Sequence, residues 1–174
     1  RYVRAAASVP VYATRKTIPG LRLWEKRAVV SGGGMTHRMN LADGVLVKDN
    51  HLAALSACGI PVAASLRRLC RGRRAEVEAK TFPEVRLALA AGARVIMLDG
   101  MPMARLRQAM GLIRGRARGG RPAGRPAVEI SGGVTLRNIR ALARLRPDRI
   151  SVGAITHSAS ALDFSLEILP PGQS

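Results

Sequence analysis

Short runs rich in valine and isoleucine alternate with longer segments of helical spacing along nearly the whole chain. This alternation predicts six strands, which are Val9–Ala13, Gly44–Val47, Ala75–Ala79, Arg94–Leu98, Ala127–Ile130 and Arg149–Val152. The other segments predict helices at Leu21–Val30, Leu52–Arg71, Pro83–Ala91, Met103–Arg114, Thr135–Leu145 and Ala159–Ile168, and in the opening stretch RYVRAAA. Strands joined by helical crossovers run parallel, in either an open doubly wound sheet or a barrel.

Polar residues at the strand ends favour a barrel over the open sheet. Each predicted strand ends in a chemically capable group, and these groups are Arg15-Lys16, Lys48-Asp49, Glu78, Asp99, Ser131-Gly132-Gly133 and Gly153. In a barrel the carboxyl ends of the strands form the active-site face. Six strands are fewer than the eight of a complete barrel, so we expect an open or incomplete α/β barrel of about six parallel strands with surrounding helices.

Composition fits one α/β domain that covers residues 1–174. The chain has 174 residues, a hydrophobic content of 47 % and only 3 % aromatic residues, so its core consists of aliphatic side chains. The formal net charge of +18 is typical of nucleic-acid binders. The few aromatic side chains are scattered singly, however, and the cationic run Arg114–Arg125 reads as a surface loop. We therefore expect acidic small-molecule substrates and no nucleic-acid partner.

The cellular context follows from the cysteines and from the apolar segments. Cys58 and Cys70 lie in no CxxC pair and at no zinc-ligand spacing, so we expect both to be reduced. Charged residues interrupt the most apolar stretch, Val85–Met103, and no signal region opens the chain. We expect a cytoplasmic protein without a membrane partner. Because the first residue is Arg1 rather than Met, we also expect the chain to be a fragment.

Two basic segments are candidates for anion binding. TRKTIPGLR follows the first strand and carries three cations, Arg15, Lys16 and Arg22. Three glycines precede His37 and Arg38, and an arginine fork matches a carboxylate. A solvated turn and a flexible linker are the alternatives for these segments.

Acidic residues lie on two of the predicted strands. Glu76 and Glu78 are two residues apart and share a face, and Asp99 ends the apolar run VIML. Lys48 follows another strand, at the expected barrel mouth. Carboxylates in such a place are costly unless they meet cations, a metal or sugar hydroxyls, and structural ion pairs remain an alternative.

Glycine turns after the last two strands suggest a phosphate site. Ser131-Gly132-Gly133 precedes a predicted helix, and Gly153 follows the next strand. Backbone N–H groups in such turns bind phosphate, which barrels often hold between their last two loops.

These blocks together resemble the quinolinate phosphoribosyltransferase family, the carboxylating nicotinate-nucleotide pyrophosphorylases of NAD biosynthesis. The resemblance runs from about Thr14 to Ile168 and rests on TRKTIPGLR, GGGMTHRMNLADGVLVKDNH, EVEA with VIMLDG, VEISGG and ISVGAITHSASALDFSLEI. It implies a pentosyltransferase in which quinolinate attacks phosphoribosyl pyrophosphate with Mg²⁺. The products would be nicotinate mononucleotide, pyrophosphate and carbon dioxide.

The resemblance also implies roles for the cationic residues. Arg15, His37 and Arg38 would contact the two quinolinate carboxylates. Lys16 and Lys48 would lie near the pyrophosphate and the carboxylates, as catalytic and substrate-binding groups.

The remaining site residues match the ribose and phosphate ends of the family site. Glu78 and Asp99 would be catalytic, would meet the ribose hydroxyls and would hold Mg²⁺, directly or indirectly. The positions that match the 5′-phosphate loops are Ser131, Gly132, Gly133 and Gly153, with His157 as a weaker substrate contact. Gly100 follows Asp99 where the family has asparagine, which would loosen the ribose end of the site.

The family further implies a homodimer or higher homo-oligomer, in which an N-terminal domain lends an arginine to the partner's site, and we expect this chain to lack that domain. Two alternatives stay open. One is the related molybdenum-transport-associated protein, which has a similar TRKT start and SGG loop, although KDNH and THS argue against it. The other is a catalytically silent barrel fragment that binds phosphorylated ligands or another chain.

Overall fold

The structure, a computed structural model, describes residues 1–72, 75–117 and 125–168 as one parallel sheet with helices around it. The strands are β1 (Val11–Ala13), β2 (Met35–Thr36), β3 (Leu46–Val47), β4 (Glu76–Ala79), β5 (Val95–Asp99), β6 (Ala127–Ser131) and β7 (Arg149–Val152). The helices are α1 (Tyr2–Ala6), α2 (Arg22–Ser31), α3 (Asp49–Ala57), α4 (Val62–Cys70), α5 (Phe82–Ala91), α6 (Met103–Ala117), α7 (Ile139–Ala143) and α8 (Ala154–His157).

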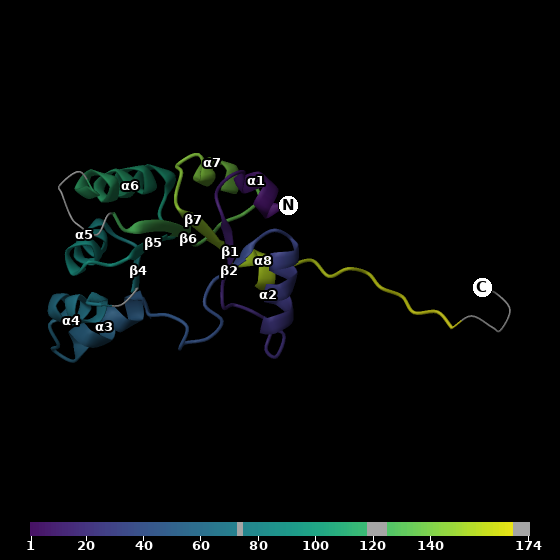
Figure 1. Ribbon diagram of the computed structural model, residues 1–174, viewed down its shortest axis with the longest axis horizontal. Coiled ribbons are helices and arrows are strands. Elements are labelled where there is room, and N and C mark those ends of the chain that lie inside the picture. The colour runs from purple at the N-terminus through teal and green to yellow at the C-terminus, as the bar shows by residue number, and fades with distance from the viewer. Residues whose placement is uncertain (73–74, 118–124, 169–174) are drawn as a thin grey trace.

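The strand order confirms the incomplete barrel. The order across the sheet is β2-β1-β7-β6-β5-β4-β3, and every pair is parallel. Joining the two edges would give the consecutive ring of a closed barrel, so the ring is broken between β2 and β3 (Figure 1). The chain crosses this gap through the segment that links the two edge strands.

Period-two alternation gives the sheet one apolar and one polar face. Ile96 and Leu98 in β5 and Ile130 in β6 are at most 1 % exposed and belong to the core against the helices. The intervening residues Glu129 and Asp99 face the concave side of the sheet, because successive side chains in a strand point to opposite faces. The chemistry of the sheet is therefore concentrated on its concave face.

Local signals explain which helix boundaries the sequence predicted correctly. Thr81 caps α5 in a capping box with Glu84, and Gly92 ends that helix in the left-handed conformation. The single helix predicted over Leu52–Arg71 is wrong. It divides into α3 and α4 because Gly59 has a φ of 67° and Pro61 caps the second helix.

Three more predictions need correction within the described residues. A strand at Met35–Thr36 was not expected, because two residues carry no readable periodicity, and it raises the number of strands from six to seven. The helix predicted over Thr135–Leu145 is shortened to α7, since the Asn138 side chain accepts a hydrogen bond from Thr135 and donates one to Gly133 in the preceding turn. The loop predicted at Arg114–Arg125 begins later, because α6 continues to Ala117, and residues 118–124 lie outside the described residues.

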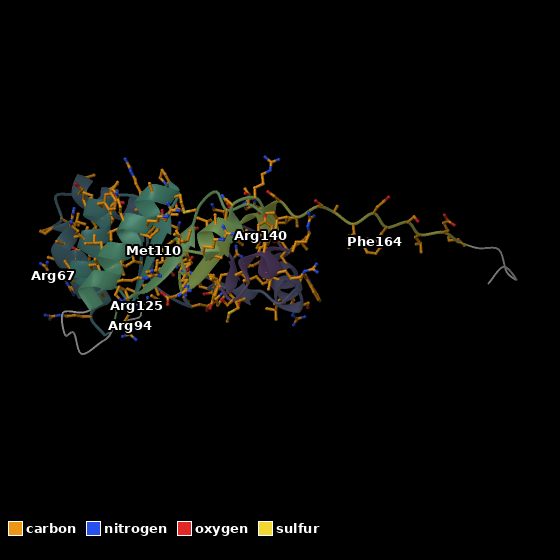
Figure 2. All side chains as sticks on the ribbon, turned by 90° about the horizontal axis from the view of Figure 1, so that it is seen from above. Arg67, Arg94, Met110, Arg125, Arg140 and Phe164 are labelled. Atoms are coloured by element: carbon orange, nitrogen blue, oxygen red, sulfur yellow. The ribbon has the colours of Figure 1, made fainter. Side chains whose placement is uncertain are left out.

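The helix predicted over Ala159–Ile168 is also wrong. This segment is extended and leaves the body of the molecule, as Figures 1 and 2 show around Phe164. Its four large apolar side chains are 78–94 % exposed, and they are Leu162, Phe164, Leu166 and Ile168. A short amphipathic helix gains most of its stability from tertiary packing, and this segment packs against nothing in the described part of the chain. None of the helices among the described residues is long and apolar enough to cross a bilayer.

We predict that replacing Phe164 and Leu166 together by serine leaves the free energy of unfolding within about 0.5 kcal/mol, because both side chains are already exposed. Self-association at high concentration should decrease, since an exposed apolar patch is removed. Urea unfolding and light scattering measure the two effects. Ile113→Ala, at a fully buried position in α6, is the control and should cost about 2–5 kcal/mol. Equal destabilisation by both changes would contradict the exposed position of the segment.

Candidate functional site

A cluster of opposite charges lies at the carboxyl ends of β3, β4 and β5. The Lys48 ammonium donates to Glu78 Oε2 at 2.7 Å, and Lys80 Nζ lies 3.7 Å from Glu78 Oε1 and 3.9 Å from Asp99 Oδ2. Lys80 also donates to Asp49 at 2.5 Å. Three predicted site residues, Lys48, Glu78 and Asp99, are thus brought together, and sequence reasoning missed the lysine that links the two carboxylates.

The glycine turn after β6 is in close contact with Asp99. A Cβ on Gly132 would lie 2.5 Å from the Gly100 nitrogen and 2.8 Å from Asp99 Oδ1, and Gly132 has a φ of 80°. Gly100 also has positive φ, at 65°, and donates its N–H to the Ser131 carbonyl at 2.9 Å. Gly100 therefore suits a left-handed position where a side chain would be strained. The predicted phosphate loop and the predicted ribose carboxylate are in contact.

A hydrogen bond and a close contact also join the carboxyl ends of β1 and β7. The Thr156 hydroxyl donates to the Lys16 carbonyl at 2.6 Å, which ties α8 to the loop after β1. A Cβ on Gly153 would lie 2.6 Å from His157 Nε2, so the imidazole covers this glycine. Lys16, Gly153 and His157 therefore lie together at the ends of β1 and β7.

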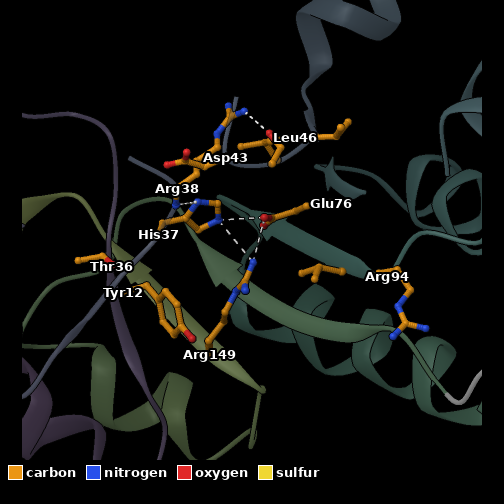
Figure 3. A pocket seen from close by; sticks show the side chains of 12 residues that line it. Tyr12, Thr36, His37, Arg38, Asp43, Leu46, Glu76, Arg94 and Arg149 are labelled. Atoms are coloured by element: carbon orange, nitrogen blue, oxygen red, sulfur yellow. Dashed lines mark hydrogen bonds and ion pairs between the residues drawn. The ribbon is translucent and has the colours of Figure 1, made fainter. Parts of the chain in front are cut away.

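A hollow of about 420 Å³ opens where the barrel ring is broken (Figure 3). Its walls come from both edges of the gap and from the concave face, and its lining residues are Tyr12, Thr36, His37, Arg38, Asp43, Gly44, Val45, Leu46, Glu76, Arg94, Val95 and Arg149. Arg38 crosses the gap by donating from Nη1 to the Gly44 carbonyl at 2.9 Å. The predicted phosphate loops do not line this hollow, so the site has two parts along the concave face.

Charged side chains from β4, β6 and β7 and from the residue after β2 meet at the hollow. His37 Nε2 lies 2.9 Å from Glu76 Oε2, which also accepts from Arg149 Nη2 at 2.9 Å. Arg149 Nε donates to Glu129, and the guanidinium carbon lies 5.1 Å from the centre of the Tyr12 ring. Glu129 is fully buried and Glu76 is 5 % exposed. Figure 3 shows His37 and Arg149 converging on Glu76.

The two buried carboxylates have opposite pKa shifts. Burial, and then the charge of Glu76, raise the pKa of Glu129 to about 7. Burial also acts to raise the pKa of Glu76, but His37 and Arg149 hold it below its ordinary value. Two buried carboxylates share the single guanidinium of Arg149, so Glu129 favours its protonated form.

This cluster also contains a set of potential metal ligands. Nitrogen and oxygen atoms of His37, Glu76 and Glu129 all lie within 4.8 Å of one another. The Arg149 guanidinium already hydrogen bonds to both carboxylates, however. The positive charge at this position is therefore supplied by the protein itself.

A buried lysine supports the segment that carries the predicted carboxylate ligands. Lys26, in α2, is 1 % exposed, and its ammonium donates to the carbonyls of His37 at 2.7 Å and Arg38 at 2.8 Å. Burial, and then the charge of Arg22, lower the pKa of Lys26. Burial, and then the charge of Arg15, also lower the pKa of Arg38.

Sequence reasoning assigned no role to Glu129, Arg149 or Lys26, and it preferred Glu78 to Glu76. A signal existed for the strand residues, because Glu76 and Glu129 interrupt apolar strands with period two, as Glu78 does. Lys26 carried no such signal, since lysine in an amphipathic helix is normally exposed.

Comparisons with known proteins show which family the sequence and the fold resemble. The family model described as "Quinolinate phosphoribosyl transferase, C-terminal domain" matches residues 1–167. A protein of Archaeoglobus fulgidus, named "Probable nicotinate-nucleotide pyrophosphorylase (carboxylating)", is 42 % identical over 95 % of this chain and 62 % of its own length. A Bacillus subtilis protein of the same name is 39 % identical over 95 % of this chain and 54 % of its own length.

A solved structure has the same fold. The crystal structure of NadC from Streptococcus pyogenes is 38 % identical, with a TM-score of 0.77, over 95 % of this chain and 56 % of that one. The chain therefore spans a little more than half the length of the relatives that it matches.

We predict that Gly132→Ala destabilises the protein and weakens phosphate binding, because the new Cβ would collide with the backbone of Gly100. Gly20→Ala is the matched control. Gly20 has nearly the same φ, 81°, but nothing lies within 4 Å of its added Cβ, so only the backbone strain of about 1–2 kcal/mol applies. Thermal unfolding and phosphate titration measure the difference. Similar losses in both variants would contradict the close contact at Gly132.

We also predict a pH-dependent difference in stability between the wild type and Glu129→Gln. With a folded pKa of about 7 against an ordinary 4.5, Glu129 keeps a proton that the unfolded chain releases. Its contribution to the free energy of unfolding is therefore present at low pH and is lost as pH rises through this interval. Urea unfolding of both proteins at about pH 5 and about pH 7.5 measures the change.

Asp148→Asn is the control of opposite sign. Burial acts to raise the pKa of Asp148, but Arg125 and the Val128 amide hold it below its ordinary value. Its contribution is therefore present at high pH and is lost in acid. If the wild type gained stability relative to Glu129→Gln as pH rose, the proton on Glu129 would be excluded.

Proposed function

Because the chain belongs to the quinolinate phosphoribosyltransferase family, whose C-terminal domain it matches over residues 1–167, we propose that it transfers phosphoribose from phosphoribosyl pyrophosphate to quinolinate. The products are nicotinate mononucleotide, pyrophosphate and carbon dioxide, in the synthesis of NAD. The observation that carries this proposal is the Lys48–Glu78–Lys80–Asp99 cluster against the Gly132 turn, since it combines cations, anions and phosphate-binding backbone.

The mixture of charges fits the bond changes of the reaction. The pyridine nitrogen of quinolinate forms a bond to C1′ while the bond from C1′ to the pyrophosphate oxygen breaks. Glu78 and Asp99 stabilise the positive charge that develops on the ribose, and Lys16 and Lys48 stabilise the leaving pyrophosphate. The glycine turns at Gly132 and Gly153 bind the 5′-phosphate through backbone N–H groups.

Decarboxylation then needs no dedicated base. After glycosylation the ring nitrogen is cationic, so it stabilises the electron pair that the departing carbon dioxide leaves on the adjacent ring carbon. That carbon then takes a proton from water. Arg15 and Arg38 bind the carboxylates of quinolinate. His37 completes this end of the site.

Mg²⁺ fits the oxygen-rich end of the site as part of the substrate complex. Glu78 and Asp99 offer the hard oxygen ligands that Mg²⁺ prefers, and each also lies near Lys80. Because Lys80 partly neutralises both carboxylates, they suit a cation that would take most of its ligands from pyrophosphate and water. The ion would neutralise negative charge on the leaving pyrophosphate.

We propose a homodimer or higher homo-oligomer in the cytoplasm as the working form. Several large apolar side chains around α2 and β2 are about half exposed or more, as expected of a contact surface, and these are Ile18, Leu23, Trp24, Val30 and Met35. Cys58 and Cys70 are both free, which suits a reducing compartment. Sedimentation measures the assembly.

The proposal is tested by incubating the chain with quinolinate, phosphoribosyl pyrophosphate and Mg²⁺. Formation of nicotinate mononucleotide and carbon dioxide in equal amounts is the expected result. Binding of phosphate ligands without binding of quinolinate would instead support a silent phosphate-binding barrel. The names of the relatives above favour the nicotinate-nucleotide reaction over a role in molybdenum transport.

We predict that Arg38→Ala weakens quinolinate binding by about 2–4 kcal/mol and phosphate binding much less, because the arginine fork serves the carboxylates. Calorimetric titration with each ligand separates the two effects. Arg140→Ala, on the exposed surface of α7, is the control and should bind both ligands like the wild type. Equal losses for quinolinate and phosphate in Arg38→Ala would refute the assignment.

A further inference from the structure

Arg149 is the central residue of the cluster in the hollow, and the family resemblance gives it no role. Its Nε donates to Glu129 and its Nη2 to Glu76, so one planar guanidinium joins carboxylates from two strands. The same group lies over the Tyr12 ring. Lysine could not reproduce this geometry, because an ammonium is a point charge without a fixed fork.

The hydrogen bonds around His37 determine which ring nitrogen carries its proton. Nδ1 accepts the backbone N–H of Arg38 at 2.9 Å, so Nδ1 is unprotonated. Nε2 therefore carries the hydrogen, and it points at Glu76 Oε2 at 2.9 Å. Glu76 thus fixes both the tautomer and the orientation of the imidazole.

The connection continues to the carboxylate-binding end of the hollow. The His37 ring holds the Arg38 amide, and Arg38 reaches across the barrel gap to Gly44. Arg149 in turn holds Glu76, whose other oxygen, Oε1, is buried without a partner in the described residues. Without the guanidinium, Glu76 would keep only His37 among these contacts, and a buried carboxylate with so few partners is costly.

We propose that Arg149 is a positioning residue that acts through Glu76 and His37 to hold Arg38 in place for a carboxylate of the substrate. The inference rests on the proposed function for the identity of that substrate. The arrangement of Arg149, Glu76 and His37 does not depend on it, so the two can fail separately.

The test compares wild type, Arg149→Met and Arg149→Lys in the full chain. Titration calorimetry gives the affinities for quinolinate and for phosphoribosyl pyrophosphate. Long-range ¹H–¹⁵N spectra give the tautomer of His37, which is readily assigned because the chain has three histidines. His51 is an internal reference, since its Nδ1 also accepts a backbone N–H, that of Lys48.

We predict that Arg149→Met lowers quinolinate affinity on the order of tenfold by misplacing the carboxylate-binding group, with little change for phosphoribosyl pyrophosphate. The His37 spectrum should change from the Nε2–H tautomer to a mixture, while His51 stays as it was. Arg149→Lys should give an intermediate affinity, because it restores the charge but not the bridge.

Arg140→Met is the matched control. Arg140 lies on the exposed surface of α7 and is not among the residues that line the hollow. Its replacement should leave the His37 tautomer and both affinities unchanged.

Three outcomes would overturn the positioning role. They are an Nδ1–H tautomer in the wild type, an unchanged His37 spectrum in Arg149→Met, and equal weakening of both ligands with a lower melting temperature. A wild type that shows the Nε2–H tautomer but does not bind quinolinate would refute the proposed substrate. The action of Arg149 on His37 would then be judged from the spectra of the wild type and Arg149→Met alone.

Discussion

Burial of two carboxylates beside one guanidinium is the constraint on which the concave face depends. Glu76 and Glu129 are almost completely shielded from water, and an ionised carboxylate in that place is costly without a partner. Arg149 bridges them, and His37 adds a further contact to Glu76. Side chains therefore connect strands from both sides of the break in the ring, where no backbone ladder joins β2 to β3.

The open ring also explains why the site has two parts. At the strand ends, close contact between Asp99 and the Gly132 turn brings a carboxylate against the backbone that is predicted to bind phosphate. In the gap, His37 and Arg38 lie on the edge that β2 forms, and both line the hollow of about 420 Å³ that opens there. Both parts lie on the concave face of one sheet, so a ligand that spans them needs an acidic end and a phosphorylated end.

Sequence reasoning was wrong where it passed over local helix breakers and where it assumed a packing partner. The spacing over Leu52–Arg71 is helical throughout, yet Gly59 and Pro61 divide it. The segment Ala159–Ile168 has helix-forming residues, but its apolar side chains find no surface among the described residues, and a helix of that length is marginal without one. Pattern alone cannot state whether a packing partner is present.

The sequence by itself determined the parallel α/β architecture, because period two and period 3.6 alternate along it and crossovers have one hand. It also determined that Lys48, Glu78, Asp99 and the Ser131 turn meet, since carboxyl ends of parallel strands share one edge. Only the tertiary structure decided that the break in the open ring lies between β2 and β3 and that Arg149 is the internal cation. Those outcomes depend on register and burial across strands distant in sequence, which no local spacing encodes.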